Sequence, residues 1–325
     1  MKNKILALFA SLSMSGFVFG DIQIGENVTI KGFIDASYQN TNSDAAATDS
    51  ADISLDEVEI DFLFTSGAVQ ARVDLDTGFQ NLAADDANGI EQAHFTYTTD
   101  GGLSVTVGRF GSALGFERED PAGLYTYSRA YSQNNGRFNL GNIDNNDHRS
   151  DGVRFGYATD SYSITASVDQ NIDQNLTAND SRLNYEIALA FTGIENLNVG
   201  VGYRNDRSSS VTGDDHNVIN VHAAYTAGKA LVAAEYTVLD PETSGAKDAD
   251  ALMLLLDYDF TDKLGGAIRY SQEDTSATAD QTKWTIAPNY QITDNLGTIV
   301  EFSSINPDGG NNDSTQFAVE LTYTF

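Results

Sequence analysis

Carboxylates recur at every second position in several stretches of the chain, and they are its most conspicuous reactive side chains. Glu57, Glu59 and Asp61 alternate with apolar residues, and Asp74 and Asp76 repeat the pattern a little further on. Side chains two residues apart on a strand point to the same face, so each stretch sets a row of negative charge on one surface. Such rows attract cations through their field, without a nucleophile or a cofactor.

The residues needed for other chemistry are not arranged for it. No Gly-x-Ser-x-Gly motif of a serine hydrolase occurs, and the four histidines lack metal-ligand spacing. Cysteine is absent, which excludes disulfides and thiol catalysis. The acid-rich stretches 85–89 and 306–310 resemble calcium loops, but the glutamate that completes an EF-hand is not in its place. We therefore expect no cofactor and no dedicated metal site, with at most weak binding of divalent cations at outer loops.

The overall charge is strongly acidic. The chain has 18 Lys and Arg against 47 Asp and Glu, a formal net charge of −29. Binding to nucleic acid phosphates requires basic patches, so this composition argues against a nucleic-acid partner. It fits a surface that meets water, cations or the divalent ions bound to lipopolysaccharide.

The first twenty residues have the layout of a secretory signal peptide. A basic start, Met1 to Lys4, precedes an apolar stretch from Ile5 to Phe19, and Gly20 ends it. The apolar stretch is shorter than the ~20 residues that a transmembrane helix needs. We expect cleavage before Asp21, which leaves one domain over residues 21–325.

Period-two alternation is the dominant pattern of that domain. At its end, Phe317, Val319, Leu321, Tyr323 and Phe325 face one way, and polar residues mostly face the other. Sixteen such segments are predicted to be strands. They are 28–40, 53–65, 68–77, 90–99, 103–111, 149–158, 161–170, 181–192, 196–205, 217–226, 229–239, 250–261, 263–272, 281–292, 295–304 and 315–325.

The connections between these segments alternate between tight and long. Tight turns such as 66–67, 100–102 and 227–228 are followed by longer connections rich in Asp, Asn, Ser and Gly. Short turns at one end and long loops at the other are typical of an antiparallel transmembrane β-barrel, and many aromatic residues near the strand ends suit its two interfacial girdles. A soluble β-sandwich also alternates, but the strand count favours a barrel, with sixteen strands expected and fourteen or eighteen still open.

The polar phase of the strands is predicted to line the interior. Its acids would cost several kcal/mol each if they were buried without partners, so we expect them to face water in a lumen wide enough for an aqueous channel. The predicted lumen acids are Asp35, Glu57, Glu59, Asp61 and Asp74. Basic residues in the strands are fewer, which predicts a preference for cations.

One connection, residues 112–148, is far longer than the others. It holds Phe116, Tyr125, Tyr127 and Tyr131, and these aromatics make it a poor candidate for disorder. Structureless loops of this length in compact folds are usually functional. We predict that it is ordered and folded into the barrel.

The residues flanking this connection resemble those of Gram-negative general diffusion porins. Gly108-Arg109 ends the strand before it, and Arg149-Ser150-Asp151-Gly152-Val153 begins the strand after it. The resemblance implies that Arg109 and Arg149 line one wall of a pore constriction. It also implies that acids on the long loop face them, here Glu117, Glu119 and Asp120, and we add Arg72 from the polar phase of 68–77.

The resemblance implies a location and partners as well. Phe325 with Tyr323 would be the assembly signal for insertion into the outer membrane, with the termini in the periplasm and the barrel among lipid and lipopolysaccharide. A homotrimer and passive passage of ions and small hydrophilic solutes follow from the same likeness. A substrate-specific channel, an adhesin or structural barrel, and an outer-membrane hydrolase are the alternatives.

The chain departs from the porin pattern in two places. The Pro-Glu-Phe-Gly often found at the loop tip is replaced by Phe116-Glu117-Arg118-Glu119-Asp120-Pro121. Arg109 and Arg149 also fall in the apolar phase of their strands, so an inward position needs a β-bulge at Gly108 or near Gly152. Without a bulge they would lie at the membrane interface as snorkelling arginines.

Overall fold

The fold is that of a computed structural model, which describes residues 21–44, 49–76, 89–117, 120–131, 149–171, 183–207, 216–241, 248–274, 280–308 and 313–325. The predicted signal peptide, residues 1–20, therefore lies outside the described residues. Among the residues described, no helix is both long and apolar enough for a membrane span.

Antiparallel strands make up nearly all of the described chain, with one 3-10 turn, η3 (Pro121–Gly123). The strands are β1 (Ile22–Ile24), β2 (Val28–Ser43), β3 (Ser50–Ser66), β4 (Val69–Asp76), β5 (Ile90–Thr98), β6 (Leu103–Gly111), β7 (Arg149–Ala158), β8 (Tyr162–Asn171), β9 (Asn184–Phe191), β10 (Leu197–Asp206), β11 (His216–Ala227), β12 (Ala230–Pro241), β13 (Ala249–Asp259), β14 (Leu264–Asp274), β15 (Gln281–Gln291), β16 (Leu296–Pro307) and β17 (Ser314–Thr324).

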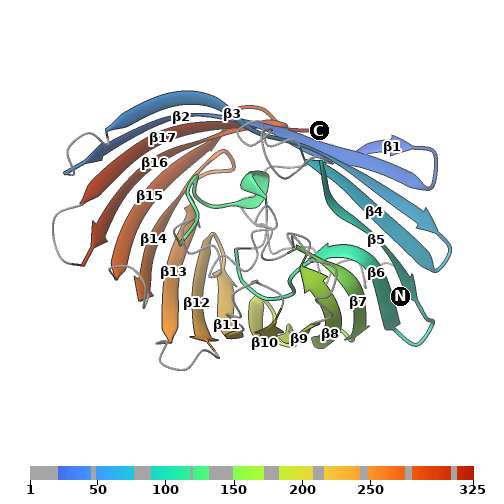
Figure 1. The fold of residues 1–325 in the computed structure, drawn as a ribbon. Coiled ribbons are helices and arrows are strands. Elements are labelled where there is room, and N and C mark those ends of the chain that lie inside the picture. The colour runs from blue at the N-terminus through green and yellow to red at the C-terminus, as the bar shows by residue number, and fades with distance from the viewer. Residues whose placement is uncertain are drawn as a thin grey trace.

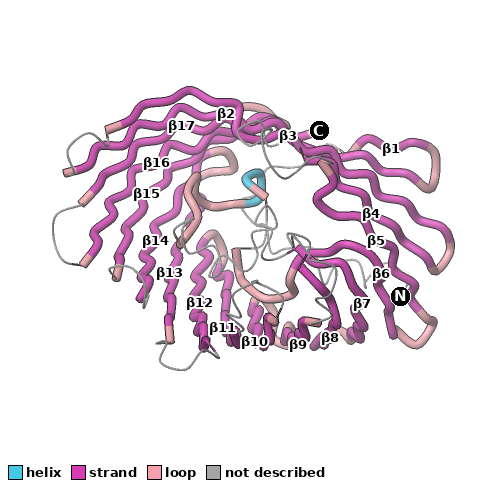
Figure 2. The backbone as a smooth tube through the Cα atoms, in the orientation of Figure 1, coloured by secondary structure: helices cyan, strands magenta, loops and turns pink. Residues whose placement is uncertain are grey.

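Strands β2 to β17 form a closed ring of sixteen (Figures 1 and 2). Each pairs with its neighbours in the chain, and β17 closes the ring by pairing with β2 from Phe33 to Ser43. At the seam, the Gly32 and Phe325 backbones exchange two hydrogen bonds of 2.8 and 2.9 Å. Closure satisfies every edge, which is what a sheet in hydrocarbon requires because lipid offers no hydrogen bonds.

The predicted count of sixteen strands is confirmed, with boundaries that differ by a few residues. The largest differences are of three residues, at the ends of β2 and β16 and at the starts of β3 and β9. The short β1 was not predicted; it forms a hairpin with β2, pairing Ile22 with Ile30. Three residues are too few to show alternation, so the pattern carried no signal there.

The two ends of the barrel differ as expected. Within the ring of sixteen, seven connections of two to five residues join the strands at the end where Asp21 and Phe325 lie, the short-turn end. Gly67 and Gly228 in the two-residue turns have positive φ angles, which glycine adopts without steric cost. The strand ends that the other connections of the ring join, six to 37 residues apart, lie at the opposite, long-loop end.

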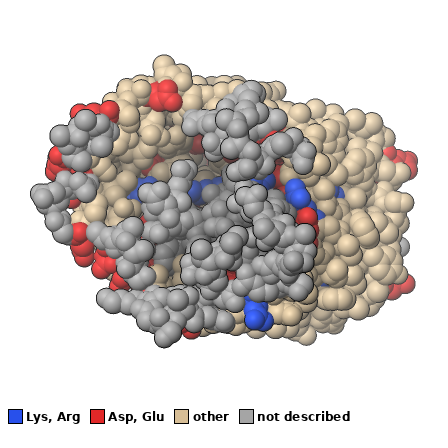
Figure 3. Space-filling model, in the orientation of Figure 1, with Lys and Arg blue, Asp and Glu red and all other residues tan. Residues whose placement is uncertain are grey.

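The outer face of the barrel is apolar and rich in aromatic rings. Outward side chains such as Ile286, Val232 and Leu254 are about half exposed, and the outer wall at the right of Figure 3 is nearly free of charge. Towards the long-loop end, Tyr270 packs on Trp284 with ring centroids 4.8 Å apart, and Phe302 packs on Phe317 at 4.9 Å. Such rings fit the girdles of a transmembrane barrel.

A charge on this outer face should destabilise the barrel in lipid. We expect Leu254→Arg, at the middle of β13, to lower the free energy of unfolding by about 2–4 kcal/mol, because the guanidinium would meet hydrocarbon. The free energy of unfolding is measured by urea titration in phospholipid vesicles. Unfolding is monitored through the fluorescence of Trp284, the one tryptophan of the chain.

Asp262→Arg supplies the matched control, because Asp262 is exposed in the 260–263 turn. This substitution should lower the free energy of unfolding by about 0–1 kcal/mol, as for charges near a membrane interface. Equal effects of the two substitutions would show that β13 does not cross the hydrocarbon.

Candidate pore lining and inner loop

The start of the long connection is bound to the inner wall of the barrel. We call residues 112–117 and 120–131 the inner loop. Ser112 Oγ donates to Glu186 on β9 over 2.6 Å, and Ala113 N donates to the same carboxylate over 2.7 Å. Phe116 N donates to Glu235 on β12 over 2.9 Å. The predicted folding of this connection into the barrel is confirmed for these residues, and Figure 1 shows them crossing the lumen.

Arg269 on β14 is the main attachment of the rest of the inner loop. Its guanidinium is fully buried and lies 2.6 Å from Glu117 and 2.6 Å from Thr126 Oγ1. It also donates to the backbone carbonyls of Ser128 and Arg129 over 2.6 and 2.8 Å. One arginine therefore holds both limbs of the loop, and its charge is compensated by Glu117.

Three more strands hold the returning limb. Ser128 donates to Glu301 on β16 through its N at 3.0 Å and its Oγ at 2.5 Å. Lys283 on β15 donates to Ser128 Oγ over 2.5 Å. Tyr127 donates to Gln39 on β2 over 3.1 Å. Burial raises the pKa of Tyr127 to about 12, so this hydroxyl keeps its proton and stays a donor.

An apolar patch on the inner wall lies beneath the loop. Leu114, Ala130 and Tyr131 pack against buried inward side chains of β11 to β16, among them Met253 and Leu255. Phe116 and Tyr125 lie parallel above it with ring centroids 6.4 Å apart. The inner loop is thus fixed by desolvated polar contacts and by apolar packing together, which makes it part of the wall.

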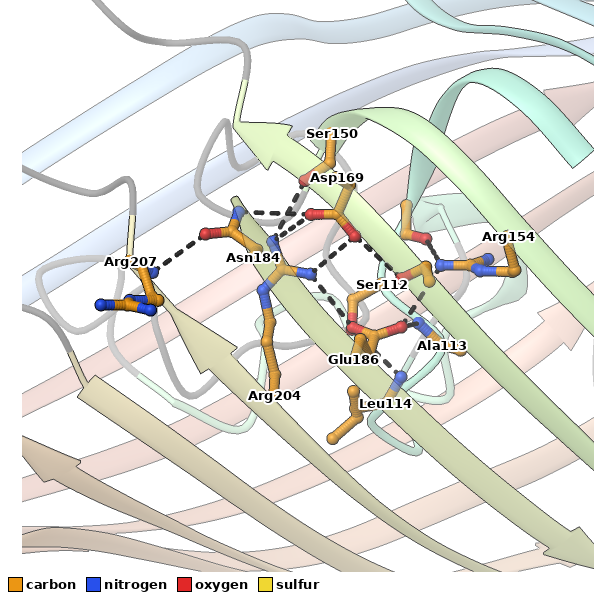
Figure 4. A network of polar contacts seen from close by, with 12 residues as sticks. Ser112, Ala113, Leu114, Ser150, Arg154, Asp169, Asn184, Glu186, Arg204 and Arg207 are labelled. Carbon is orange, nitrogen blue, oxygen red and sulfur yellow. Dashed lines mark hydrogen bonds and ion pairs between the residues drawn. The ribbon is translucent and has the colours of Figure 1, made fainter. Parts of the chain in front are cut away.

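A second network supports the base of the loop (Figure 4). Arg204 on β10 is buried between Asp169 at 2.8 Å and Glu186 at 3.4 Å, and it also donates to Ser150 Oγ over 3.1 Å. Arg154 on β7 lies 3.3 Å from Glu186. Two arginines thus hold the carboxylate that receives the loop, since a buried acid without partners would be costly.

Strands β3 to β5 carry a concentration of negative charge that faces the tip of the loop. We call it the acidic cluster, and its members are Glu57, Glu59, Asp61, Asp74, Glu91 and Asp120, with Lys31 and Arg72 beside them. Arg72 Nε lies 2.6 Å from Asp74, and its Nη2 lies 3.3 Å from Asp61. Asp120 comes from the inner loop, so the cluster joins the loop tip to the wall opposite the one that holds Arg269.

The predicted lumen acids point inward, but the prediction that they face water is wrong. Asp35, Glu59 and Asp74 are 1%, 1% and 0% exposed, and Glu57 and Asp61 are also buried. Neighbouring side chains cover them: Thr322 donates to Asp35 over 3.2 Å, and Arg72 and Gln92 donate to Asp74 over 2.7 Å each. The expectation that these acids face water assumed that a buried acid would have no partners.

The predicted inward turn of Arg109 is also wrong. Gly108 has a φ of +128°, yet the pairing of β6 with both neighbours runs on without a shift. Arg109 therefore stays in the outward phase and forms an ion pair of 2.9 Å with Asp151, whose side chain is 58% exposed. The next residue, Phe110, lies inside under the Arg154 guanidinium, 4.3 Å from its ring centroid.

The other predicted constriction residues have different positions. Glu117, Asp120 and Arg72 lie in the lumen, in the contacts given above, whereas Glu119 lies outside the described residues. Arg149 is buried as the first residue of β7, opposite Gly111, and no bulge occurs near Gly152. The loop acid Glu117 therefore pairs with Arg269, a residue that the porin resemblance did not single out.

Sequence reasoning missed Glu91. Strict alternation puts it in the outward phase with Ala93 and Phe95, but a register shift between β4 and β5 turns it inward. The adjacent polar pair Glu91-Gln92 breaks the alternation, and that break was the available signal of a bulge. Arg204 and Arg269 were predicted to lie in strands, but a strand pattern does not show which loop a side chain holds.

Loss of Arg269 should release the inner loop. We expect Arg269→Met to raise the single-channel conductance, because it leaves Glu117 without this ion pair and removes five donated hydrogen bonds. Breaking a buried pair in this way costs about 3–5 kcal/mol, so the loop should also become open to trypsin at Arg129. Planar-bilayer recording and limited proteolysis measure the two effects.

Arg109→Met is the matched control, since it removes an arginine of the outer face. It should leave conductance and cleavage unchanged. A conductance change with Arg109→Met and none with Arg269→Met would contradict the placement of both side chains.

Comparisons with known proteins agree with this fold. The OmpT of Vibrio cholerae is 15% identical with a TM-score of 0.62, covering 94% of this chain and 100% of that one. Salmonella typhi OmpF, in a complex with daunomycin, is 16% identical with a TM-score of 0.65, covering 94% and 100%. The outer membrane channel DcaP of Acinetobacter baumannii is 12% identical with a TM-score of 0.65, covering 94% and 99%.

Identities this low establish a shared fold and no more. A search of curated protein sequences finds no significant match. The family profile described as "Putative beta-barrel porin-2, OmpL-like" matches residues 27–325, nearly the whole ring of strands. On this match, the chain belongs to the OmpL-like family of β-barrel porins.

Proposed function

We propose that the protein is an outer-membrane channel for passive diffusion of ions and small hydrophilic solutes, with a preference for cations. The observation that carries this proposal is the inner loop, which is fixed across a lumen whose walls are charged. A barrel of sixteen strands is wide enough for an aqueous channel, and a loop held to both sides narrows it. The narrowed lumen then limits the size of the solutes that pass, and this function needs no catalytic group.

The balance of inward charge supports cation preference. Among the described residues, fourteen carboxylate side chains are buried in the barrel against four basic ones. Lys31, Arg72 and Arg154 add positive charge at partly exposed positions, and carboxylates still predominate. Acidic linings of this kind lower the energy of a cation relative to an anion in the pore.

The charges are also distributed unevenly around the lumen. The bases that hold the inner loop, Arg204, Arg269 and Lys283, lie on β10, β14 and β15. The acidic cluster lies on β3 to β5, and Asp120 joins it from the inner loop. A solute that passes between them would experience a transverse field, which favours polar molecules over apolar ones because the latter lose hydration without compensation.

Location and assembly follow from the same proposal. The short-turn end, with Asp21 and Phe325, would lie in the periplasm, and residues 1–20 would be the signal that directs export. Contacts with lipid and lipopolysaccharide fall on the apolar outer wall. We propose a homotrimer, since a trimer form is named for the similar V. cholerae OmpT. Weak divalent-cation binding at outer loops stays a prediction.

The proposal is tested by reversal potentials across planar bilayers in a salt gradient. The wild-type protein should conduct and favour K⁺ over Cl⁻, and Asp120→Asn should reduce that preference because the loop tip loses its charge. Liposome swelling with sugars of increasing size measures the size limit in the same preparation.

Asp160→Asn is the control, because Asp160 is exposed in the 159–161 turn at the mouth. Its effect on selectivity should be smaller than that of Asp120→Asn. Absence of conductance and of solute flux would reject the channel in favour of an adhesin or a hydrolase. Flux of one solute class alone would favour a substrate-specific channel.

A further inference from the structure

Three neighbouring strands each direct one carboxylate to the same point of the inner wall. Glu59 of β3, Asp74 of β4 and Glu91 of β5 have oxygens that all lie within 4.8 Å of one another. Glu57 and Asp120 form a second group of the same size with Glu59. The two groups share Glu59, so five carboxylates converge from three strands and the inner loop.

A bulge in β5 places Glu91 in this group. Asp74 pairs with Gln92 and Leu75 with Ile90, which leaves Glu91 as the extra residue between them. Glu91 is 1% exposed beside Glu59 and Asp74, whereas Phe95, which would share its face in a regular strand, is exposed on the outside. The backbone thus deviates from regular pairing to add a carboxylate where negative charge is already dense.

Glu59, at the centre, lacks the partners that a buried carboxylate needs. It is 1% exposed, and neither of its carboxylate oxygens has a hydrogen-bond partner. Arg72 Nη2 is 3.9 Å from Glu59 Oε1, because the guanidinium is engaged by Asp74 and Asp61. A buried charged group without hydrogen bonds is strongly unfavourable, so a positive ligand at this point would stabilise the side chain.

Acids outnumber bases in this part of the wall. The acidic cluster has six carboxylates, and among the described residues Lys31 and Arg72 form ion pairs with it. A divalent cation would bring positive charge to the position where Glu59 has no donor.

We propose that the acidic cluster is a Ca²⁺ site, with Glu59, Asp74 and Glu91 as ligands and with Glu57 of β3 and Asp120 of the inner loop next to them. Oxygens within 4.8 Å of one another can share a centre at about 2.8 Å or less, near the 2.3–2.6 Å of Ca²⁺–oxygen bonds. Mg²⁺ is less suited, because it keeps several waters and needs a near-octahedral shell.

Bound Ca²⁺ would join the tip of the inner loop to the wall formed by β3 to β5. The hydrogen bonds of the loop described above are to β9, β12, β14, β15, β16 and β2, and Asp120 lies beside Glu57 and Glu59 of β3. The ion would also neutralise charge at the constriction and reduce cation preference. This effect on current rests on the proposed function, but the binding itself does not.

Binding is tested by calorimetric titration of Ca²⁺ into the EDTA-treated, refolded barrel in detergent. The wild-type protein should bind about one ion per chain, with Mg²⁺ weaker. Glu59→Gln and Glu91→Gln should each weaken Ca²⁺ binding about ten-fold or more. Asp257→Asn, a buried inward carboxylate of β13 outside the cluster, should bind as the wild type does.

Folding of each variant is checked by its heat-dependent mobility on gels, and Glu59 and Glu91 give two independent variants. The wild type alone is decisive: no saturable Ca²⁺ binding up to about 10 mM, beyond the weakest range for extracellular calcium sites, would overturn the proposal. Equal affinity of wild type, Glu59→Gln and Glu91→Gln would also overturn it, by placing the ion elsewhere.

Current recordings separate this proposal from the channel itself. With Ca²⁺ in place of EDTA, the K⁺ over Cl⁻ preference of the wild type should fall, and that of Glu91→Gln should change less. Calorimetric binding without any conductance would support the calcium site and reject the channel. Conductance without Ca²⁺ binding would support the channel and reject the calcium site.

Discussion

Satisfaction of backbone hydrogen bonds in a medium without water is the constraint on which the rest of the structure depends. It forces sixteen strands to close on themselves, with β17 paired to β2 and Phe325 bonded to Gly32. Closure gives every strand one face towards lipid and one towards the lumen. The apolar outer wall and the charged interior are therefore two consequences of the same hydrogen-bonded ring, and neither could exist without the other.

Within the ring, charge compensation decides which groups can be buried. Arg204 and Arg269 each hold acids that in turn hold the inner loop, so pairing and loop position are one network. The acidic cluster differs, because its carboxylates outnumber Lys31 and Arg72, the bases that form ion pairs with it among the described residues. The lumen thus combines ion pairs that fix the loop with a region where acids predominate.

The fold could be predicted from the chain alone because alternation repeats over every strand. The strand count, the short-turn end and the inward phase of Glu59 and Asp74 all follow from it. The site was predicted less well, because alternation counts residues and a bulge changes the count: Glu91 was missed, and Arg109 was expected to turn inward where no bulge exists. Partners across the lumen, such as Glu117 and Arg269, depend on loop conformation, which has no period.

The attachment of the inner loop has a consequence for the order of assembly. Its partners lie on β9 at the middle of the chain and on β16 and β2 near the two ends, so they become neighbours only after the last strand has joined the first. The loop therefore cannot take its final place in a half-built barrel. An intermediate would have a wider, unobstructed lumen, and the seated loop would mark a molecule whose insertion is finished.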